Sequence, residues 1–333
     1  MGASERKMMG FGLGRRGLVL GGGAIRASGG ARAADYPSRT VRIIVPYPAG
    51  GSNDIVARIV AQKLTERSGA GFIVDNRSGA NGNIGARAVA EAEPDGYVLL
   101  LTAPPPLTIN NALYVDMKYD AARDFAPVSL VASVPIVLTV NPALGVGSVQ
   151  ELVALAKSKP GTIHFGSAGI GSTGHLAGQL FKARTGIDIV HVPYRGEAPA
   201  IVDLMAGVTQ MMFNNLPSML PQIVAKTVRV LAVCGAERVQ ALAETPTLAE
   251  SGVAGFEASA WFGLAAPVKT PGVLVAKLIT EVAAVLGSAD VKARLAALGA
   301  EPGAVSGEAF GRTLATERVM WEGIIGASGA RAG

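Results

Sequence analysis

Residues 41–60 read VRIIVPYPAGGSNDIVARIV and place a glycine-rich turn between a strand and a helix. The β-branched run 41–45 predicts a buried strand, and apolar residues at helical spacing after Asp54 predict a helix. Glycine lets the backbone approach a ligand closely, and the free N–H groups of a first helical turn face the same space. The turn therefore predicts a bound anion at a helix start.

Two further glycine-rich turns follow predicted strands. They are residues 75–85, DNRSGANGNIG, and residues 166–176, GSAGIGSTGHL. In an open parallel sheet, ligands bind beyond the carboxyl ends of the strands, where all three turns would lie. We therefore expect the three turns to share one anion site, with Ser172 or Ser167 free to reach the ligand.

Polar residues at these helix starts also have structural interpretations. Ser52, Asn53 and Asp54 are candidate caps of the first helix, with Asp54 facing the positive end of its dipole. Ser172 caps a helix that begins near His175 in the same interpretation. We expect Asp54 to be structural rather than a catalytic base, and His175 to be packed and hydrogen-bonded.

Strand-like and helix-like segments alternate along most of the chain, which is typical of βαβ units and mainly parallel sheets. Most of the strands are apolar throughout, so helices should cover both sheet faces and the fold class is α/β. The predicted strands are 41–46, 72–75, 97–101, 136–140, 162–166, 188–193, 209–214 and 228–233. The predicted helices between them include 53–67, 149–158, 173–184, 197–206 and 217–226.

The last part of the chain differs from the rest. Three helices with almost no strand between them are predicted at 272–287, 289–298 and 307–326. About 300 residues is more than one ordinary core holds, so we expect two lobes. Lobe 1 would combine 34–135 with 258–333, lobe 2 would be 136–257, and the C-terminal helices would pack on lobe 1. The chain would cross between lobes at 133–135 and 257–261, and a hinged cleft between lobes is a common ligand site.

The first 33 residues have the layout of a secretory signal peptide. They contain Arg6, Lys7, Arg15 and Arg16, then a weakly apolar run at 17–25 and the small-x-small site Ala31-Arg32-Ala33. Because the apolar run is far shorter than the roughly 20 residues of a membrane span, we expect cleavage and a periplasmic protein. Both Sec and twin-arginine export fit the residues, and a cytosolic N-terminal extension is the alternative.

Removing this segment changes the charge balance. The chain has 30 basic and 25 acidic residues, and the segment holds six basic residues and one acid, so the mature protein has 24 of each. A net charge of zero removes the basis for nucleic acid as a partner. Cys234 is the only cysteine. No intrachain disulfide or cysteine-based metal site is therefore possible, and we expect Cys234 to be a small buried side chain.

Dinucleotide binding, serine hydrolysis and metal binding fit these residues less well. Residues 169–174 match the dinucleotide pattern G-x-G-x-x-G, but Asp188 falls at the beginning of its strand and not at the end where a ribose-binding acid belongs. No G-x-S-x-G hydrolase motif occurs. The three histidines lack metal-ligand spacing. We expect neither an enzyme nor a cofactor nor a metal site, with a nicotinamide-dependent oxidoreductase as the remaining enzyme alternative.

The chain resembles the solute-binding receptors of tripartite tricarboxylate transporters, the Bug family, from about Tyr36 to its end. The resemblance rests on several short motifs taken together and in order. They are Tyr36-Pro37 through Ile44-Val45-Pro46, residues 49–54, residues 76–82 with Gly85, residues 94–97, residues 169–172 with His175-Leu176, residues 191–196, and Pro246-Thr247 with residues 250–252.

The resemblance implies a two-lobed periplasmic binding protein, type II-like, that closes on a small carboxylate or dicarboxylate. It implies delivery to membrane permease subunits, and we expect a monomer. The implied binding loops contain Tyr47, Ala49, Gly50, Gly51, Ser52, Asp54, Thr102, Ala103, Ser167, Ala168, Gly169, Ser172 and Asn214. Tyr47, Phe213 and Trp261 are candidates for the cleft wall, and each is equally a candidate core side chain.

Two departures from the family pattern bear on the ligand. The loop after Thr102 is proline-rich at 104–106, which predicts a stiff wall. Asn214 stands where relatives often carry an acid, which would remove a negative charge and favour a more anionic ligand. A sensory receptor that presents its liganded form to a signalling partner remains an alternative to the transport receptor.

Overall fold

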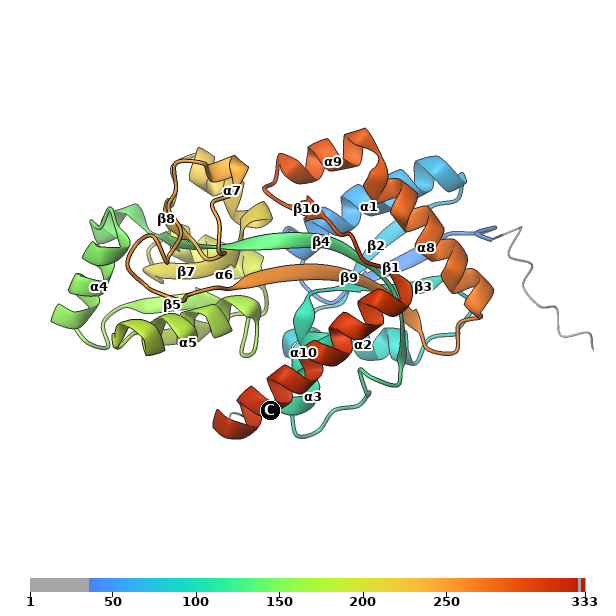
Figure 1. Ribbon diagram of the computed structural model, residues 1–333, viewed down its shortest axis with the longest axis horizontal. Coiled ribbons are helices and arrows are strands. Elements are labelled where there is room, and N and C mark those ends of the chain that lie inside the picture. Colours follow the sequence, from blue (N-terminus) through green and yellow to red (C-terminus); the bar gives the residue numbers. More distant parts are fainter. Residues whose placement is uncertain (1–35, 329–330, 333) are drawn as a thin grey trace, which may run out of the picture.

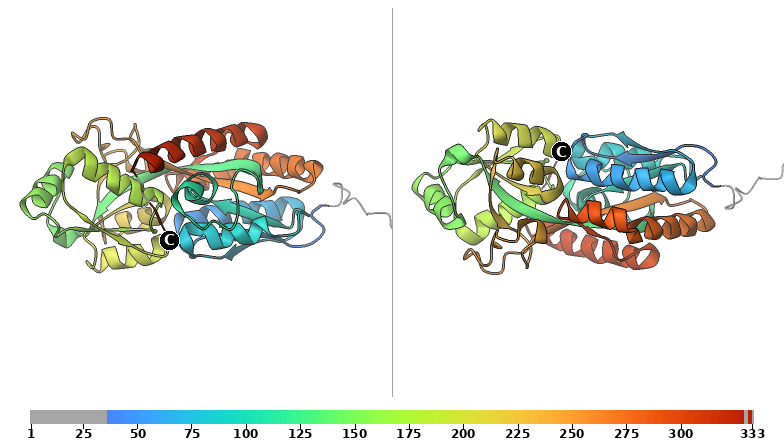
Figure 2. Two further views of the ribbon diagram at one scale, coloured as in Figure 1. Left: turned by 90° about the horizontal axis from the view of Figure 1, so that it is seen from below. Right: turned by 90° about the horizontal axis from the view of Figure 1, so that it is seen from above.

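The structure, a computed structural model, describes residues 36–328, 331 and 332. The expected export signal at 1–33 lies outside the described residues. The molecule is elongated, with helices flanking a long twisted sheet (Figure 1). Two groups of helices and strands lie at its two ends and are joined by long strands, which gives the two-lobed arrangement (Figure 2).

The first lobe is built on three parallel strands in the order β2-β1-β3. They are β1 (Val41–Val45), β2 (Phe72–Asn76) and β3 (Val98–Thr102), connected by α1 (Ser52–Ser68) and α2 (Asn83–Ala90). After β3 the chain forms a π-helical turn, η3 (Pro105–Ile109), and the short α3 (Asn110–Leu113). The proline-rich stretch is thus part of a buried helical turn.

The second lobe repeats the same layering. Its parallel strands lie in the order β7-β5-β6. They are β5 (His164–Ser167), β6 (Val190–Pro193) and β7 (Met211–Asn215), with β8 (Arg229–Val233) pairing beside them on β4. The helices are α4 (Val149–Ser158), α5 (Thr173–Thr185), α6 (Glu197–Met205) and α7 (Leu216–Val224).

Two long antiparallel strands join the lobes, β4 (Phe125–Val140) and β9 (Ser259–Pro267). β4 pairs with β9 over its first part and with β7 and β8 over residues 136–140. The candidate crossing segments lie side by side, because Pro135 is opposite Ser259 and Val134 is opposite Ala260. The exact lobe boundaries remain a prediction.

Local sequence patterns did not predict β9 or the first eleven residues of β4. Pro127 and Pro135 interrupt β4, and proline is disfavoured within sheets. The sequence of β9, SAWFGLAAP, lacks β-branched residues. Contacts with the neighbouring strands override these weak local preferences. The sheet is also more mixed than expected, since both crossing strands pair antiparallel with their neighbours.

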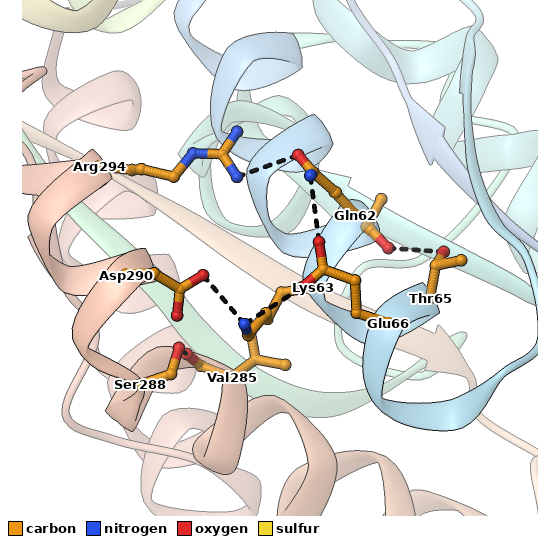
Figure 3. A network of polar contacts seen from close by, with 9 residues as sticks. Gln62, Lys63, Thr65, Glu66, Val285, Ser288, Asp290 and Arg294 are labelled. Atoms are coloured by element: carbon orange, nitrogen blue, oxygen red, sulfur yellow. Dashed lines mark hydrogen bonds and ion pairs between the residues drawn. The ribbon is translucent and has the colours of Figure 1, made fainter.

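The C-terminal helices α8 (Gly272–Gly287) and α9 (Ala289–Ala296) pack beside α1. Figure 3 shows the polar contacts between them, in which Lys63 pairs with Asp290 at 3.0 Å and Arg294 donates to Gln62 at 3.0 Å. The short β10 (Glu301–Pro302) pairs with β4, and α10 (Gly307–Ser328) packs against β4 and η3. The end of the chain therefore braces the first lobe.

The core runs through both lobes and contains the sole cysteine. Cys234 is completely buried, as predicted, and burial raises the pKa of its thiol well above the ordinary value. Among the described residues, no single helix is long and apolar enough to cross a membrane. Helices α8 and α9 taken together have the length and composition of a membrane span, but they are bent by 67° where they join. Leu274, Leu278 and Val282 of α8 are buried in the core.

Candidate ligand-binding site

A cavity lies where the two lobes meet. Its empty space, counted together with open solvent at its mouth, is about 390 Å³. The first lobe lines it with Tyr47, Gly51, Asn53, Ala103 and Pro105, the crossing strand β9 with Phe262, and the second lobe with Ala168, Ser172, Thr173, Glu197 and Asn215. The starts of α1 and α5 thus face the same cavity.

The predicted site residues divide into two groups. Tyr47, Gly51, Ala103, Ala168 and Ser172 line the cavity. The others do not belong to its lining: Ala49, Gly50, Ser52, Asp54, Thr102, Ser167, Gly169 and Asn214. Of the three glycine-rich turns, the one at 75–85 contributes no residue to the lining of this cavity, and a site shared by all three remains a prediction. Ligand contact by the lining residues remains a prediction.

Two lining residues lie one position from a predicted site residue. Asn215, at the end of the strand that the resemblance implied, lines the cavity next to Asn214, and Phe262 lines it next to Trp261. Successive residues of a strand point to opposite faces, so an error of one position selects the wrong side. Trp261 instead packs edge-on against Phe310 and donates to Glu317, and Phe213 is fully buried in the core. Pro105 belongs to the proline-rich wall predicted after Thr102, and Asn53 lies in the first glycine-rich turn. Thr173 and Glu197 gave no sequence signal that distinguished them from structural residues.

The first glycine-rich turn is held by Asp54. The Gly50 amide donates to its carboxylate at 3.0 Å, and Asn76 and Arg58 donate to the same group at 3.0 Å. Burial pushes the pKa of Asp54 upward, but these hydrogen bonds outweigh it and leave the pKa below its ordinary value. Asp54 is therefore an ionised structural residue in this turn.

The helix that follows starts differently from the expectation. Its N-cap is Gly51, which makes no side-chain cap, so the assignment of Ser52 or Asn53 as the cap is wrong. Asn53 instead bridges to the end of β3. Its amide lies within 2.9 Å of the Leu101 carbonyl and 3.2 Å of the Ala103 amide, and the orientation that satisfies both has the nitrogen toward the carbonyl and the oxygen toward the amide. Asn53 thereby fixes the loop that carries Ala103 and Pro105.

Glu197 of the second lobe reaches the start of α1 in the first lobe. Its Oε2 accepts from the Ser52 amide at 2.7 Å and from the Ser218 hydroxyl at 2.9 Å, and its Oε1 accepts from Asn215 Nδ2 at 2.6 Å. The Ser52 hydroxyl also donates to Ser218 Oγ at 2.9 Å. The anion at this helix start is therefore a carboxylate of the protein itself.

The starts of three helices, α1, α6 and α7, converge on the Glu197 carboxylate. Glu197 is the first residue of α6, and Ser218 lies in the first turn of α7. Burial raises the pKa of Glu197, while hydrogen bonds from Ser52, Ser218 and Asn215 oppose that rise. Three helix dipoles also favour its negative charge. Glu197 supplies a carboxylate beside Asn215, so the neutral residue at 214 does not leave this part of the site without an acid.

The loop of the second lobe is held by two histidines. The Ser167 hydroxyl lies 2.7 Å from His191 Nε2, and the Gly169 amide donates to Ser167 Oγ at 3.1 Å. Ser172 caps α5 as predicted by accepting from the His175 amide at 3.3 Å. His175 Nδ1 accepts from the Gly171 amide at 3.1 Å, so His175 is packed and hydrogen-bonded, also as predicted.

Two hydroxyl groups and the charge of the lining complete the site. The buried hydroxyls of Tyr47 and Thr102 have no hydrogen-bond partner of good geometry among the described residues, although the Thr102 hydroxyl still counteracts the burial that raises the pKa of Tyr47. Among the described lining residues, Glu197 is the only charged side chain. An anionic ligand here would be held by amides and hydroxyls rather than by a basic side chain.

Two further observations concern the alternatives of a dinucleotide site and a metal site. Asp188 pairs with Lys182 at 3.2 Å, away from the end of its strand where a dinucleotide ribose would bind. Within residues 36–328, 331 and 332, no group of three or more His, Cys, Asp or Glu residues could hold a metal ion.

Known proteins resemble this chain in sequence and in fold. The model of the tripartite tricarboxylate transporter family receptor matches residues 56–330. Protein BugT of Bordetella pertussis is 37% identical over 297 residues, which cover 89% of this chain and 91% of that protein.

Two solved structures are similar over nearly their whole length. Rpa4515 of R. palustris, solved with adipate, is 41% identical with a TM-score of 0.87 and covers 90% of this chain and 100% of its own. MatC of Rhodopseudomonas palustris, solved with malate, is 29% identical with a TM-score of 0.82 and covers 87% and 100%. With the cavity between two lobes and the family model matching most of its length, this chain belongs to the tripartite tricarboxylate transporter receptor family.

Proposed function

We propose that this protein captures a small carboxylate between its two lobes and delivers it to the membrane subunits of a tripartite tricarboxylate transporter. The observation that carries the proposal is the cavity at the starts of α1 and α5, which both lobes line together. Amide donors at helix starts favour negative charge, and a site shared between lobes favours the closed form once it is filled.

The ligand carboxylate is expected at the end of the cavity away from Glu197. We expect Ser172 and Thr173 of α5, and Tyr47 and Ala103 of the first lobe, to surround the carboxylate, because they line the same cavity and carry no charge. Like charges repel, so the Glu197 carboxylate disfavours an anion at the start of α1. The adipate and malate bound to the two similar structures support a carboxylate as the ligand class.

No bond needs to be made or broken for this function. The family and its solved members are binding proteins, and the proposal includes no catalytic residue and no cofactor. We propose a periplasmic location after removal of residues 1–33, a monomeric state, and lobe boundaries near residues 135 and 258.

Thermal unfolding and calorimetry with adipate and malate test the proposal. A ligand that binds only the folded state at 100 times its Kd adds about 2.7 kcal/mol to the unfolding free energy, so Tm should rise. If neither acid, nor a wider set of small acids at millimolar concentration, gave a Tm shift or heat, the carboxylate proposal would be wrong. Tight binding of NADH, detected by its fluorescence, would support the oxidoreductase alternative instead.

Capture of membrane partners tests the second half of the proposal. Purified protein, with and without the acid that binds it, is used to pull down proteins from detergent-solubilised membranes. Ligand-dependent recovery of the permease subunits is expected. Recovery of a signalling kinase in their place would show that the protein is a sensory receptor.

A further inference from the structure

The side chain of Asn215 is a buried acceptor on the wall of the cavity. Asn215 is 6% exposed, lines the cavity, and its Oδ1 has no hydrogen-bond partner among the described residues. An unpaired buried acceptor is costly, typically by about 1–3 kcal/mol. A ligand that donates a hydrogen bond to this atom would remove that cost.

Glu197 fixes which end of the Asn215 amide is free. Asn215 Nδ2 donates to Glu197 Oε1 at 2.6 Å, and a carboxylate can only accept. The amide nitrogen must therefore face Glu197, which leaves the oxygen as the end that lacks a partner. The orientation of Asn215 is thus set by the charge beside it.

The carboxylate that sets this orientation is itself held from both lobes. Ser52 of α1 and Ser218 of α7 both donate to Glu197 Oε2. The Ser52 amide reaches it only when the lobes are together, since α1 belongs to the first lobe and α6 to the second. Closure therefore adds a donor to the carboxylate that orients Asn215.

We propose that Glu197 and Asn215 form a specificity-determining pair that selects a carboxylate bearing a hydrogen-bond donor, a hydroxyl or an ammonium group, opposite its carboxylate. Asn215 is the group that contacts the ligand, and Glu197 is a positioning residue that acts through Asn215. The inference rests on the proposed function, because it concerns the ligand class of the same cavity.

Calorimetry with matched acids tests the pair on the whole mature protein. Succinate, malate and aspartate share a four-carbon skeleton and differ by a hydrogen, a hydroxyl or an ammonium group; adipate and 3-hydroxyadipate form a longer pair. At the chain length that fits, the donor-bearing acid should bind at least tenfold tighter than the plain diacid. Whichever of malate and aspartate binds more tightly shows whether a hydroxyl or an ammonium group is the preferred donor.

The outcomes separate this inference from the proposed function. If the plain diacids bind as tightly as their donor-bearing partners, the pair does not select a donor, and carboxylate binding still stands. If none of the five acids binds at 10 mM, both the carboxylate proposal and this inference are wrong.

The substitution Glu197→Gln gives a second, more specific test. The glutamine oxygen would keep the Ser52 and Ser218 donors, and its amide nitrogen would face Asn215 and turn the asparagine amide around. The cavity would then meet a donor, so the preference for malate over succinate should fall to about one or reverse.

Glu151→Gln is the matched control. Glu151 also lies in the first turn of a helix and accepts a backbone amide, that of Gly147 at 2.6 Å, but within one lobe and outside the cavity. This control should keep the wild-type preference. Asn215→Leu, which removes the acceptor, should weaken malate binding more than succinate binding. An unchanged ratio in both Glu197→Gln and Asn215→Leu would overturn the proposal, provided that thermal unfolding shows both variants to be folded.

Discussion

The imidazole rings of His175 and His191 lie 4.1 Å apart, centroid to centroid, beneath the loop that carries Ser172. Burial lowers the pKa of His175 to about 4. Burial, together with the neighbouring His175, lowers the pKa of His191 to about 3. Both rings are therefore neutral at physiological pH and hold the loop through Gly171 and Ser167.

This pair predicts a loss of stability in mild acid. An unfolded histidine takes up a proton near pH 6.5, whereas the folded rings resist protonation until about pH 4 and 3. The unfolded state binds more protons in that interval, so the free energy of unfolding should fall as the pH drops from about 6.5 toward 4. Burial raises the pKa of Glu197, which has the opposite sign, so a comparison with a histidine variant is needed.

Urea unfolding at pH 7.5 and pH 5.0 makes this comparison. The double variant His175→Gln/His191→Gln should lose less unfolding free energy between these two pH values than the wild type. Equal losses in the two proteins would contradict a role for the stacked histidines.

Substitution of two helix-capping serines distinguishes an effect on protein stability from an effect on ligand binding. Ser172 caps α5 and lines the cavity, whereas Ser148 caps α4 outside it by accepting from the Glu151 amide at 3.2 Å. Ser172→Ala and Ser148→Ala should each cost about 1 kcal/mol of unfolding free energy. Only Ser172→Ala should also weaken binding of adipate or malate in calorimetry. Equal affinities in the two variants would show that the Ser172 hydroxyl does not serve the ligand.

Gly171 lies where the two lobes approach each other closely. Gly171 has a φ of +79°, and a Cβ there would overlap the Leu113 side chain, which comes from the other lobe. Gly171→Ala should therefore hold the lobes apart and weaken ligand binding at least tenfold. Small-angle scattering should show a larger radius of gyration in the presence of ligand than the wild type has.

Gly145→Ala is the control for backbone strain. Gly145 has a similar φ of +75°, but nothing lies within 4 Å of a Cβ built there. Both alanine variants share the cost of a left-handed conformation, about 1–2 kcal/mol. Weakened binding in Gly145→Ala as well would attribute the effect to strain and not to the contact between lobes.

The Tyr47 hydroxyl offers a test with little cost to the fold. It is buried and lines the cavity without a partner of good geometry among the described residues. Tyr47→Phe should leave Tm nearly unchanged, because no well-formed hydrogen bond is lost. If the hydroxyl donates to the ligand, affinity should fall about tenfold, which corresponds to about 1.4 kcal/mol. Wild-type affinity in this variant would place the ligand away from Tyr47.

Local sequence patterns predicted most of the fold. The strands β1, β2, β3 and β8 are short apolar runs next to turn residues, and the helices α4, α8 and α10 match their predicted ranges within two residues. The strand β9 could not be predicted, because its alanine and glycine residues have little strand preference of their own. Its position depends on pairing with β3 and β4, which are distant in sequence.

The candidate site was only partly predictable. The turn at Tyr47 and the loop at Ser172 carry local signals, namely glycines and caps at helix starts. The meeting of Glu197 with Ser52 spans 145 residues of sequence and forms only when the two lobes come together. The one available signal for Glu197 was its position directly after Gly196, at the start of a predicted helix. An acid there indicates the N-terminus of a helix and not a contact with the other lobe.

The strands β4 and β9 form one hydrogen-bonded ribbon between the lobes, with Pro135 opposite Ser259. We expect this two-stranded ribbon to bend across its face more easily than its strands slide along each other, because sliding would break the hydrogen bonds between β4 and β9. Rotation of one lobe relative to the other should therefore be restricted to nearly one axis. We therefore expect the Ser52 amide to meet Glu197 in the same alignment each time the lobes close.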